Sequence, residues 1–274
     1  MDLNLNELAL GSDGGDGAAM TPAMSLALEA NFGGVERWRD EFVAIGQSHA
    51  GAAGWLALLF QPNDGTLVNR WVAEATPDLA GGMPILAVGA GKHLHPTDRI
   101  DWAAVYQRYQ HAVHEASEAF GASADEAASA MLLDVRRAGV FAQAAHLIPG
   151  ARWCDPADVE QWAAELPAGH AVLVYCVCGH EVGRTTALRL RAAGLNARIL
   201  RGGIDAWQTA GQPVRTKAVL CNVPAAALVH ESVWSECTAL VHCLNDVVTP
   251  EVHATRLSVT ETSLVAGFRC KTRQ

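Results

Sequence analysis

The first half of the chain shows the periodicity of amphipathic helices. Between residues 35 and 45, apolar side chains recur at spacings of three, four and three, which places on one helix face Val35, Trp38, Phe42 and Ile45. An earlier helix is predicted to begin at Thr21 and Pro22, because threonine caps helices well and proline is tolerated at their first position. A later helix is predicted from the shared face of Trp102, Val105, Tyr109 and Ala112.

Two strands are predicted to lie between these helices and to form a hairpin. Residues 54–60 (GWLALLF) are all apolar, which is typical of a buried strand. The turn signal Asn-Asp-Gly at 63–65 follows, and residues 66–73 are predicted to return as the second strand. Residues 76–98 are rich in glycine and proline, and this composition predicts a loop.

The second half has a different rhythm, in which short apolar strands alternate with short helices. Strands are predicted at residues 131–135, 172–175 and 197–200. Helices are predicted to begin at Asp155-Pro156, near Gly183–Arg184 and at Ile204. This alternation predicts a parallel sheet with helices on both faces.

These patterns divide the chain into five segments and predict the α/β fold class. The expected segments are a flexible lead-in at 1–20, a half with helices and a small antiparallel sheet at 21–117, a linker at 118–130, a parallel-sheet half at 131–215 and a tail at 216–274. In the tail, strands are conceivable at 240–248, but residues 218–274 have no sustained period. An altered reading frame and a flexible tail both remain open explanations of that segment.

Composition narrows the classes of partner. The formal net charge of −9 argues against a nucleic acid or an anionic membrane as partner. No run of eighteen apolar residues occurs, and the N-terminal residues lack the pattern of a signal peptide, so a cytoplasmic location is expected. The seven cysteines show no regular spacing, which does not favour a disulfide framework.

The candidate reactive group is Cys176, which ends the apolar run at 172–175. The carboxyl ends of parallel strands are where α/β sheets place their sites. Backbone N–H groups of the following loop, together with a helix start near 183–184, would favour a thiolate. The candidate active-site loop comprises Val177, Cys178, Gly179, His180, Glu181, Val182 and Gly183.

Two residues of this loop have several possible roles. Cys178 could resolve a persulfide into a disulfide, relay sulfur, or fill space beside the strand end. His180 could lower the pKa of the thiol when protonated, or hydrogen-bond across the loop. The Cys-x-Cys spacing of 176 and 178 is too short for a usual zinc site, so we expect no metal there. Asp134 and Arg136 are predicted to pair in a structural role.

The first half resembles the C-terminal domain of the iron/manganese superoxide dismutases over residues 18–115. The matching stretches occur in family order: LEANFGGVERWRDEFVAIG, GWLALLF, the NDG hairpin, PIL and IDWAAVYQRY. The resemblance implies a metal held by histidines and an aspartate, but Ala87 and Gly91 stand at the positions of the family's Asp-x-x-x-His run. The helical hairpin that carries the remaining histidines is largely lacking, so we expect no metal and no other cofactor.

The other histidines of this half do not replace the missing ligands in our interpretation. His93 and His95 are expected to be exposed loop residues, because no carboxylate is placed to complete an iron site with them. His49, His111 and His114 are expected at the surface.

The second half resembles the rhodanese domain over residues 123–215. Its landmarks are LLDVR at 132–136, HLIPGA at 146–151, VYC at 174–176 and LRGGIDAW at 200–207. The resemblance implies a sulfurtransferase that carries a persulfide on Cys176 and takes sulfur from a small-molecule donor to a thiol or cyanide acceptor. Glu181 stands where single-domain members often have arginine, and an acidic residue is unfavourable for a dianion such as thiosulfate. The GHEV form of the loop resembles a rhodanese subgroup from bacterial chromate- and stress-resistance contexts.

Three functions are therefore compared. The first is a rhodanese-type sulfurtransferase with a non-catalytic dismutase-like half. The second is a superoxide dismutase that obtains its missing ligands elsewhere. The third is a non-catalytic sensor of oxidants or oxyanions, in which the dismutase-like half forms a homodimer and Cys176 reacts with the signal.

Overall fold

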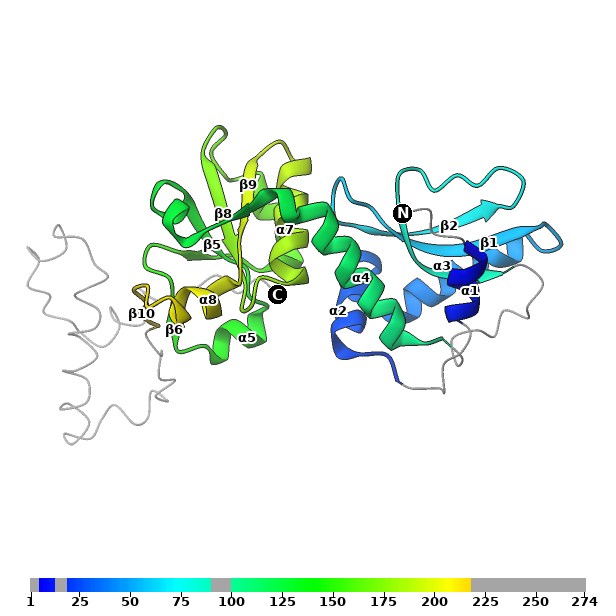
Figure 1. The fold of residues 1–274 in the computed structure, drawn as a ribbon, viewed down its shortest axis with the longest axis horizontal. Coiled ribbons are helices and arrows are strands. Elements are labelled where there is room, and N and C mark those ends of the chain that lie inside the picture. Colours follow the sequence, from blue (N-terminus) through cyan, green and yellow to red (C-terminus); the bar gives the residue numbers. More distant parts are fainter. Residues whose placement is uncertain (1–4, 13–18, 90–99, 218–274) are drawn as a thin grey trace, which may run out of the picture. The chain divides into compact units, whose positions relative to one another are not determined.

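A computed structural model describes residues 5–12, 19–89 and 100–217 of the chain (Figure 1). We call residues 5–117 the first half and residues 118–217 the second half. The strands considered at 240–248 lie outside the described residues, as do His93 and His95. No helix within the described ranges is long and apolar enough to cross a membrane.

The first half consists of helices around a small antiparallel sheet, as predicted. Its elements are α1 (Leu5–Ser12), α2 (Pro22–Phe32), α3 (Val35–Ser48), β1 (Gly54–Phe60), β2 (Leu67–Ala73), β3 (Met83–Gly89) and α4 (Trp102–Ser117). The strands pair in the order β2-β1-β3, with β1 antiparallel to both neighbours (Figure 1). The segment 76–98, predicted as a loop from its glycines and prolines, therefore contains a strand. Its short apolar run, which includes the PIL of the family resemblance, pairs with β1 and is buried.

The helices of the first half begin where their sequences predict and bury the predicted apolar faces. The side chain of Thr21 accepts a hydrogen bond from the backbone N–H of Met24 and caps α2. In α3, Trp38 and Phe42 are buried in the core. The predicted face of α4 is buried as well, and it consists of Trp102, Val105, Tyr109 and Ala112.

The second half is built on a parallel five-stranded sheet of order β4-β9-β8-β5-β7. Its strands are β4 (Gly121–Ala122), β5 (Met131–Asp134), β7 (Arg152–Trp153), β8 (Ala171–Tyr175) and β9 (Asn196–Leu200). Its α-helices are α5 (Ala138–Gln143), α6 (Val159–Ala163), α7 (Glu181–Ala192) and α8 (Gly203–Thr209). Short 3-10 helices η2 (Glu118–Phe120), η3 (Ala124–Ser129) and η4 (Pro156–Asp158), and the small antiparallel pair β6 (His146–Leu147) and β10 (Arg215–Thr216), complete it.

The segment 118–130, predicted as a linker, forms ordered elements of the second half. It contains η2, β4 and η3, and β4 pairs in parallel with β9 at the edge of the sheet. Its small polar residues resemble a linker in composition, yet a strand of this length requires few apolar side chains. Ala122 alone supplies a buried methyl group, at 1 % exposure.

Strand β8 lies at the centre of the sheet, between β5 and β9. Val172 and Val174 pack into one core with residues of α6 and α7, and Leu173 and Tyr175 pack into another with residues of α8. Both faces of β8 are therefore covered, which explains its entirely apolar sequence. The strand ends at Tyr175, so Cys176 is the first residue beyond its carboxyl end.

Candidate active site

Cys176 is held by its backbone against the start of α8. The backbone N–H of Ile204 donates to the Cys176 carbonyl oxygen at 3.0 Å, and the N–H of Asp205 donates to the Val177 carbonyl oxygen at 3.0 Å. The amino end of α8 therefore uses its free N–H groups to fix the first peptides of the loop. Only 5 % of the Cys176 residue surface is exposed.

Gly203 explains why the stretch LRGGIDAW contains adjacent glycines. Its φ of +58° lies in the left-handed region, and a Cβ there would lie 2.4 Å from the carbonyl oxygen of Val177. The backbone of the loop and the backbone before α8 approach so closely that no side chain fits between them. The landmark that signals the family in the sequence is thus a steric requirement of the Cys176 loop.

Backbone amides surround the sulfur of Cys176. The N–H groups of Gly183, Gly179 and His180 hydrogen-bond to the Cys176 thiolate and act to lower the pKa of the thiol. Burial acts more strongly in the opposite direction, so the pKa of Cys176 lies above its ordinary value. The loop amides act in the direction expected from the sequence, but burial outweighs their effect on the pKa of Cys176.

Helix α7 begins two residues earlier than expected and incorporates Glu181 in its first turn. A carboxylate in this position is favoured by the helix dipole, which gives the acidic residue a local structural reason. Burial, followed by the charge and hydrogen bonding of Glu181, raises the pKa of Tyr106 in α4 to about 12. Glu181 thus faces α4 as well as the loop.

The side chains of Cys178 and His180 are exposed. Exposure of Cys178, which is a free thiol, excludes the space-filling role beside the strand end. Burial of its sulfur, and after it the charges of Glu181 and Asp205, raise the pKa of Cys178. His180 directs its backbone N–H toward Cys176, while its imidazole makes no cap hydrogen bond to α7.

The structure places beside the Cys176 loop one residue that the sequence did not single out as part of the site, Arg184. This arginine is 7 % exposed and lies in the first turns of α7. Its Nε donates to the carbonyl oxygen of Gly179 at 2.9 Å, inside the Cys176 loop. The burial of this arginine cannot be recognised from one sequence, because an arginine next to apolar helix positions is also typical of an exposed helix face.

A buried polar network lies under the same end of the sheet. Arg136 pairs with Asp134 as predicted, and its guanidinium also donates to the carbonyl oxygen of His146 at 2.9 Å. The Tyr175 hydroxyl donates to Asp134 at 3.0 Å and accepts from the N–H of Ile148 at 3.2 Å. The network satisfies buried polar groups and joins β5, β6 and β8 behind Cys176.

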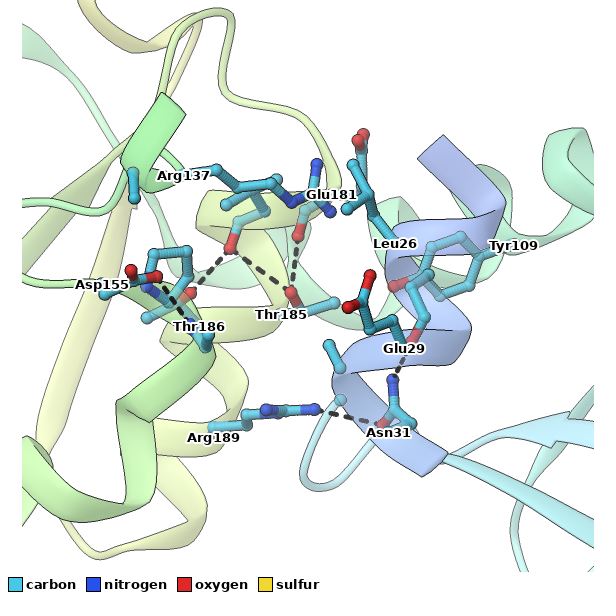
Figure 2. Close-up of a pocket in the computed structure, with 17 residues that line it drawn as sticks. Leu26, Glu29, Asn31, Tyr109, Arg137, Asp155, Glu181, Thr185, Thr186 and Arg189 are labelled. Carbon is cyan, nitrogen blue, oxygen red and sulfur yellow. Dashed lines mark hydrogen bonds between the residues drawn. The ribbon is translucent and has the colours of Figure 1, made fainter. Parts of the chain in front are cut away.

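A cavity of about 360 Å³ lies on the outer side of α7 (Figure 2). Glu181, Thr185 and Arg189 of α7 line one side of it, and residues of α2 and α4 line the other. Arg189 reaches across and donates to the side-chain oxygen of Asn31 at 3.1 Å. Cys176 is not among the lining residues, so this cavity meets the candidate site only through Glu181 and Val182.

The described residues of the first half do not fit an iron or manganese ion. Ala87, at the position of a family ligand, is buried in β3 and offers only a methyl group. No group of three or more His, Cys, Asp and Glu side chains lies together anywhere in the described part of the chain. His111 and His114 are exposed on α4 and approach Glu115 and Glu118, and His49 stacks on Trp71.

Comparison with known proteins identifies both halves. Residues 20–111 match the family "Iron/manganese superoxide dismutases, C-terminal domain", and residues 116–210 match the family "Rhodanese-like domain". A curated relative, the Fe superoxide dismutase of Cupriavidus metallidurans, is 42% identical over 92 residues. That match covers 34% of this chain and 47% of the relative, so the chain spans about half the length of that dismutase.

Solved structures match about a third of the chain. A full-length protein from Lactobacillus plantarum matches with 26% identity and a TM-score of 0.33, over 36% of this chain and 90% of that protein. A rhodanese-related protein from Thermoplasma volcanium matches with 23% identity and a TM-score of 0.30, over 35% of this chain and 96% of that protein.

Proposed function

We propose that this chain, which carries a dismutase C-terminal domain followed by a rhodanese-like domain, moves sulfane sulfur through a persulfide on Cys176. The observation that supports the proposal most is the set of three amide donors, from Gly179, His180 and Gly183, that face the Cys176 sulfur at the carboxyl end of β8. Such a cradle accommodates an anionic sulfur without a charged side chain.

The reaction proceeds in two half-steps that require no external oxidant. The Cys176 thiolate attacks the outer sulfur of a donor such as thiosulfate, the donor's S–S bond breaks, and sulfite leaves with the bonding electron pair. The terminal sulfur of the new persulfide is an anion. Cyanide or a thiolate then attacks this terminal sulfur, forming thiocyanate or an acceptor persulfide and returning Cys176 as the thiolate.

The three amides have the same role in both half-steps. They stabilise the attacking thiolate, and a terminal sulfur anion bound to Cys176 would lie at the mouth of the same loop. Because burial raises the pKa of the resting thiol, deprotonation is coupled to arrival of the donor in this proposal. Glu181, at the edge of the loop, disfavours multiply charged donors relative to neutral or singly charged persulfides.

Replacing each loop cysteine tests the assignment. We expect Cys176→Ser to abolish sulfur transfer from thiosulfate or 3-mercaptopyruvate to cyanide, since the nucleophile is lost. Cys178→Ser is the matched control two residues away and should retain at least part of the activity, because it leaves the proposed nucleophile Cys176 in place and changes only an exposed thiol. Full activity of Cys176→Ser would refute the proposal.

A thiol sensor is the second candidate, and the exposed free thiol of Cys178 two residues from Cys176 is the observation that favours it, since redox-sensing cysteines often have a resolving thiol beside them. A sensor reacts with its signal but does not turn over. Treatment with a sulfane-sulfur donor followed by mass spectrometry separates the two. A gain of about 32 Da on Cys176 that cyanide removes supports transfer; no gain with the sulfur donor, but a gain of oxygen on Cys176 in a parallel sample treated with hydrogen peroxide, supports sensing.

A further inference from the structure

The guanidinium of Arg184 connects the reactive loop to the first half of the molecule. Besides the bond from Nε to the Gly179 carbonyl oxygen, one terminal nitrogen donates to Ser117 Oγ at 2.9 Å. The other terminal nitrogen donates to the Glu118 carboxylate at 3.1 Å. All three nitrogens of one buried side chain are therefore used, and each bond points in a different direction.

The bond to Gly179 bears directly on the amide cradle. The carbonyl of Gly179 and the N–H of His180 belong to one peptide unit, and no described peptide bond is cis. In a trans peptide the carbonyl and the N–H point in opposite directions. Arg184 fixes the carbonyl on one side, so the N–H of His180 is directed toward the Cys176 sulfur on the other.

The other two bonds anchor Arg184 at the end of α4 and at the start of η2, outside the Cys176 loop. Ser117 is the last residue of α4 and is fully buried, and its hydroxyl donates in turn to the Val113 carbonyl oxygen at 2.6 Å. Glu118 follows at the start of η2 and also accepts from Arg201, which precedes the glycines of the α8 turn. The end of α4 thus positions the side chain that positions the loop.

We infer that Arg184 is a positioning residue that orients the Gly179–His180 peptide toward Cys176, and that the end of α4 sets the reactivity of Cys176 through it. The inference rests on the proposed function only in taking Cys176 as the reacting thiol. It assigns a regulatory role to the end of α4, the helix that leads from the first half into the second, because a shift of Ser117 relative to α7 changes the direction of one amide in the cradle.

Different titratable and charged groups face Cys176 and Arg184. Cys176 is faced by the amides of its own loop and by the thiol of Cys178. Arg184 is faced by Ser117 and by the carboxylate of Glu118, which His114 approaches to 3.5 Å. Replacing Cys178 with serine in every variant removes the second titrating thiol from the measurement.

The test measures alkylation of Cys176 by iodoacetamide as a function of pH, read by mass spectrometry of its peptide in a Cys178→Ser background. Arg184→Met keeps an unbranched side chain and removes all three donors. We expect the alkylation midpoint to rise by about one pH unit and the rate below the midpoint to fall about tenfold, since one unit of pKa changes the thiolate fraction tenfold.

Arg189→Met is the matched control. Arg189 lies on the same helix, has a side chain that is 12 % exposed against 9 % for the side chain of Arg184, and also bonds across to the first half, but its bonds go to Asn31 and Glu160 and not to the loop. We expect its alkylation profile to be that of the Cys178→Ser parent. Equal shifts in both variants would overturn the inference, because they would indicate general loosening between the halves.

Ser117→Ala provides a second route if Arg184→Met does not fold. It removes one acceptor from Arg184 and leaves the charge in place, so a smaller upward shift of the midpoint is expected. An unchanged midpoint in Ser117→Ala would contradict the role of α4. Sulfur transfer to cyanide from thiosulfate, from 3-mercaptopyruvate and from a singly charged persulfide is measured in parallel, and its absence with all three donors would refute the proposed function without affecting the alkylation comparison.

Discussion

At Cys176, two effects of opposite sign act on one thiol. Burial disfavours the charged sulfur, and the amides of Gly179, His180 and Gly183 favour it. Burial is the larger effect in the resting protein, so the thiol is favoured over the thiolate. In the proposed reaction the amides stabilise the anionic sulfur once it forms within the cradle. A cysteine held as the thiol in this way is protected from unselective oxidation, because oxidants react with the thiolate and not with the thiol.

Glu181 is the residue at which a single charge can be changed most cleanly. Because Glu181 raises the pKa of Cys178, Glu181→Gln should lower that pKa and increase the Cys178 thiolate fraction at a fixed pH below it. We expect alkylation of Cys178 to become faster by about twofold to fivefold at pH 8, following the same relation between pKa and thiolate fraction.

Glu165→Gln, which removes an exposed carboxylate paired with Arg152, is the control for that measurement. The same Glu181 variant should lower the KM for thiosulfate relative to that for a neutral donor, since repulsion of the dianion is reduced. A Cys178 alkylation midpoint that stays in place or rises in Glu181→Gln would contradict this account of the loop.

At the scale of elements, Glu126 joins η3 to the edge of the parallel sheet. Its carboxylate accepts from the backbone N–H of Ser123 at 2.8 Å and pairs with Arg198 of β9. These bonds, with Arg198 first, lower the pKa of Glu126 from 4.5 to about 2. The carboxylate closes a capping box at a segment that otherwise looks like a linker.

The sign of the resulting pH dependence follows from this lowered pKa. The unfolded chain binds a proton at Glu126 near pH 4.5, whereas the folded chain does so only near pH 2. The stabilisation is therefore fully present above pH 4.5 and is lost as the pH falls toward 2. We expect Glu126→Gln to lower Tm at pH 7 and to differ progressively less from the parent below pH 4.5.

Thermal unfolding followed by circular dichroism across pH 7 to 3 measures this difference. Glu36→Gln removes a carboxylate that pairs with Arg39 within one helix and serves as the control. A Tm difference between Glu126→Gln and the parent that persists unchanged to pH 3 would exclude the assigned role of Glu126.

Helices and strands with a strong hydrophobic period, or with clear capping and turn residues at their ends, could be predicted from the sequence. Short elements without such patterns could not. Trp38 and Phe42 reveal the buried face of α3 through their spacing, and the run at 172–175 reveals the central strand. The two-residue strand β4 carries no period, because it is formed by pairing with β9 rather than by its own residues. Its position depends on contacts distant in sequence.

The candidate site shows the same division. Cys176 could be found because it ends an apolar strand before a glycine-rich loop. Arg184 could not, since its importance depends on Ser117 and Gly179, which lie far apart in sequence and meet only in the fold. The raised pKa of Cys176 likewise depends on how deeply the folded chain buries the sulfur.

At the scale of the whole molecule, the two halves share packing within the described residues 19–89 and 100–217. Leu188 of α7 is 2 % exposed and belongs to the hydrophobic core of the first half. Gly65, in the hairpin turn, lies so close to α7 that a Cβ would be 3.1 Å from the Thr185 carbonyl oxygen. The dismutase-like half therefore supports the helix that begins at the reactive loop.

Leu188→Ala tests this support. Removing a buried leucine side chain leaves a cavity, and we expect a loss of about 2–5 kcal/mol in the free energy of unfolding. Because Leu188 contributes to the core of the first half from the second, urea unfolding should shift to lower concentration for both halves. Alkylation of Cys154, which is buried in the second half, reports that half alone, and tryptophan fluorescence, with tryptophans in both halves, reports the whole chain.

Leu26→Ala, which removes an exposed leucine, is the control for the same measurement. A Leu188→Ala protein in which only one of the two reporters shifts would show that the halves unfold independently.

Glu118 has one further consequence for the accuracy of the site. One of its carboxylate oxygens accepts from Arg184, which holds the loop, and the other accepts from Arg201, next to the Gly202–Gly203 turn that abuts the loop's backbone. The Glu118 carboxylate therefore holds both the Cys176 loop, through Arg184, and the Gly202–Gly203 turn, through Arg201. If Glu118 moves, the loop and the turn move in the same direction, so the distance between them changes less than the position of either one.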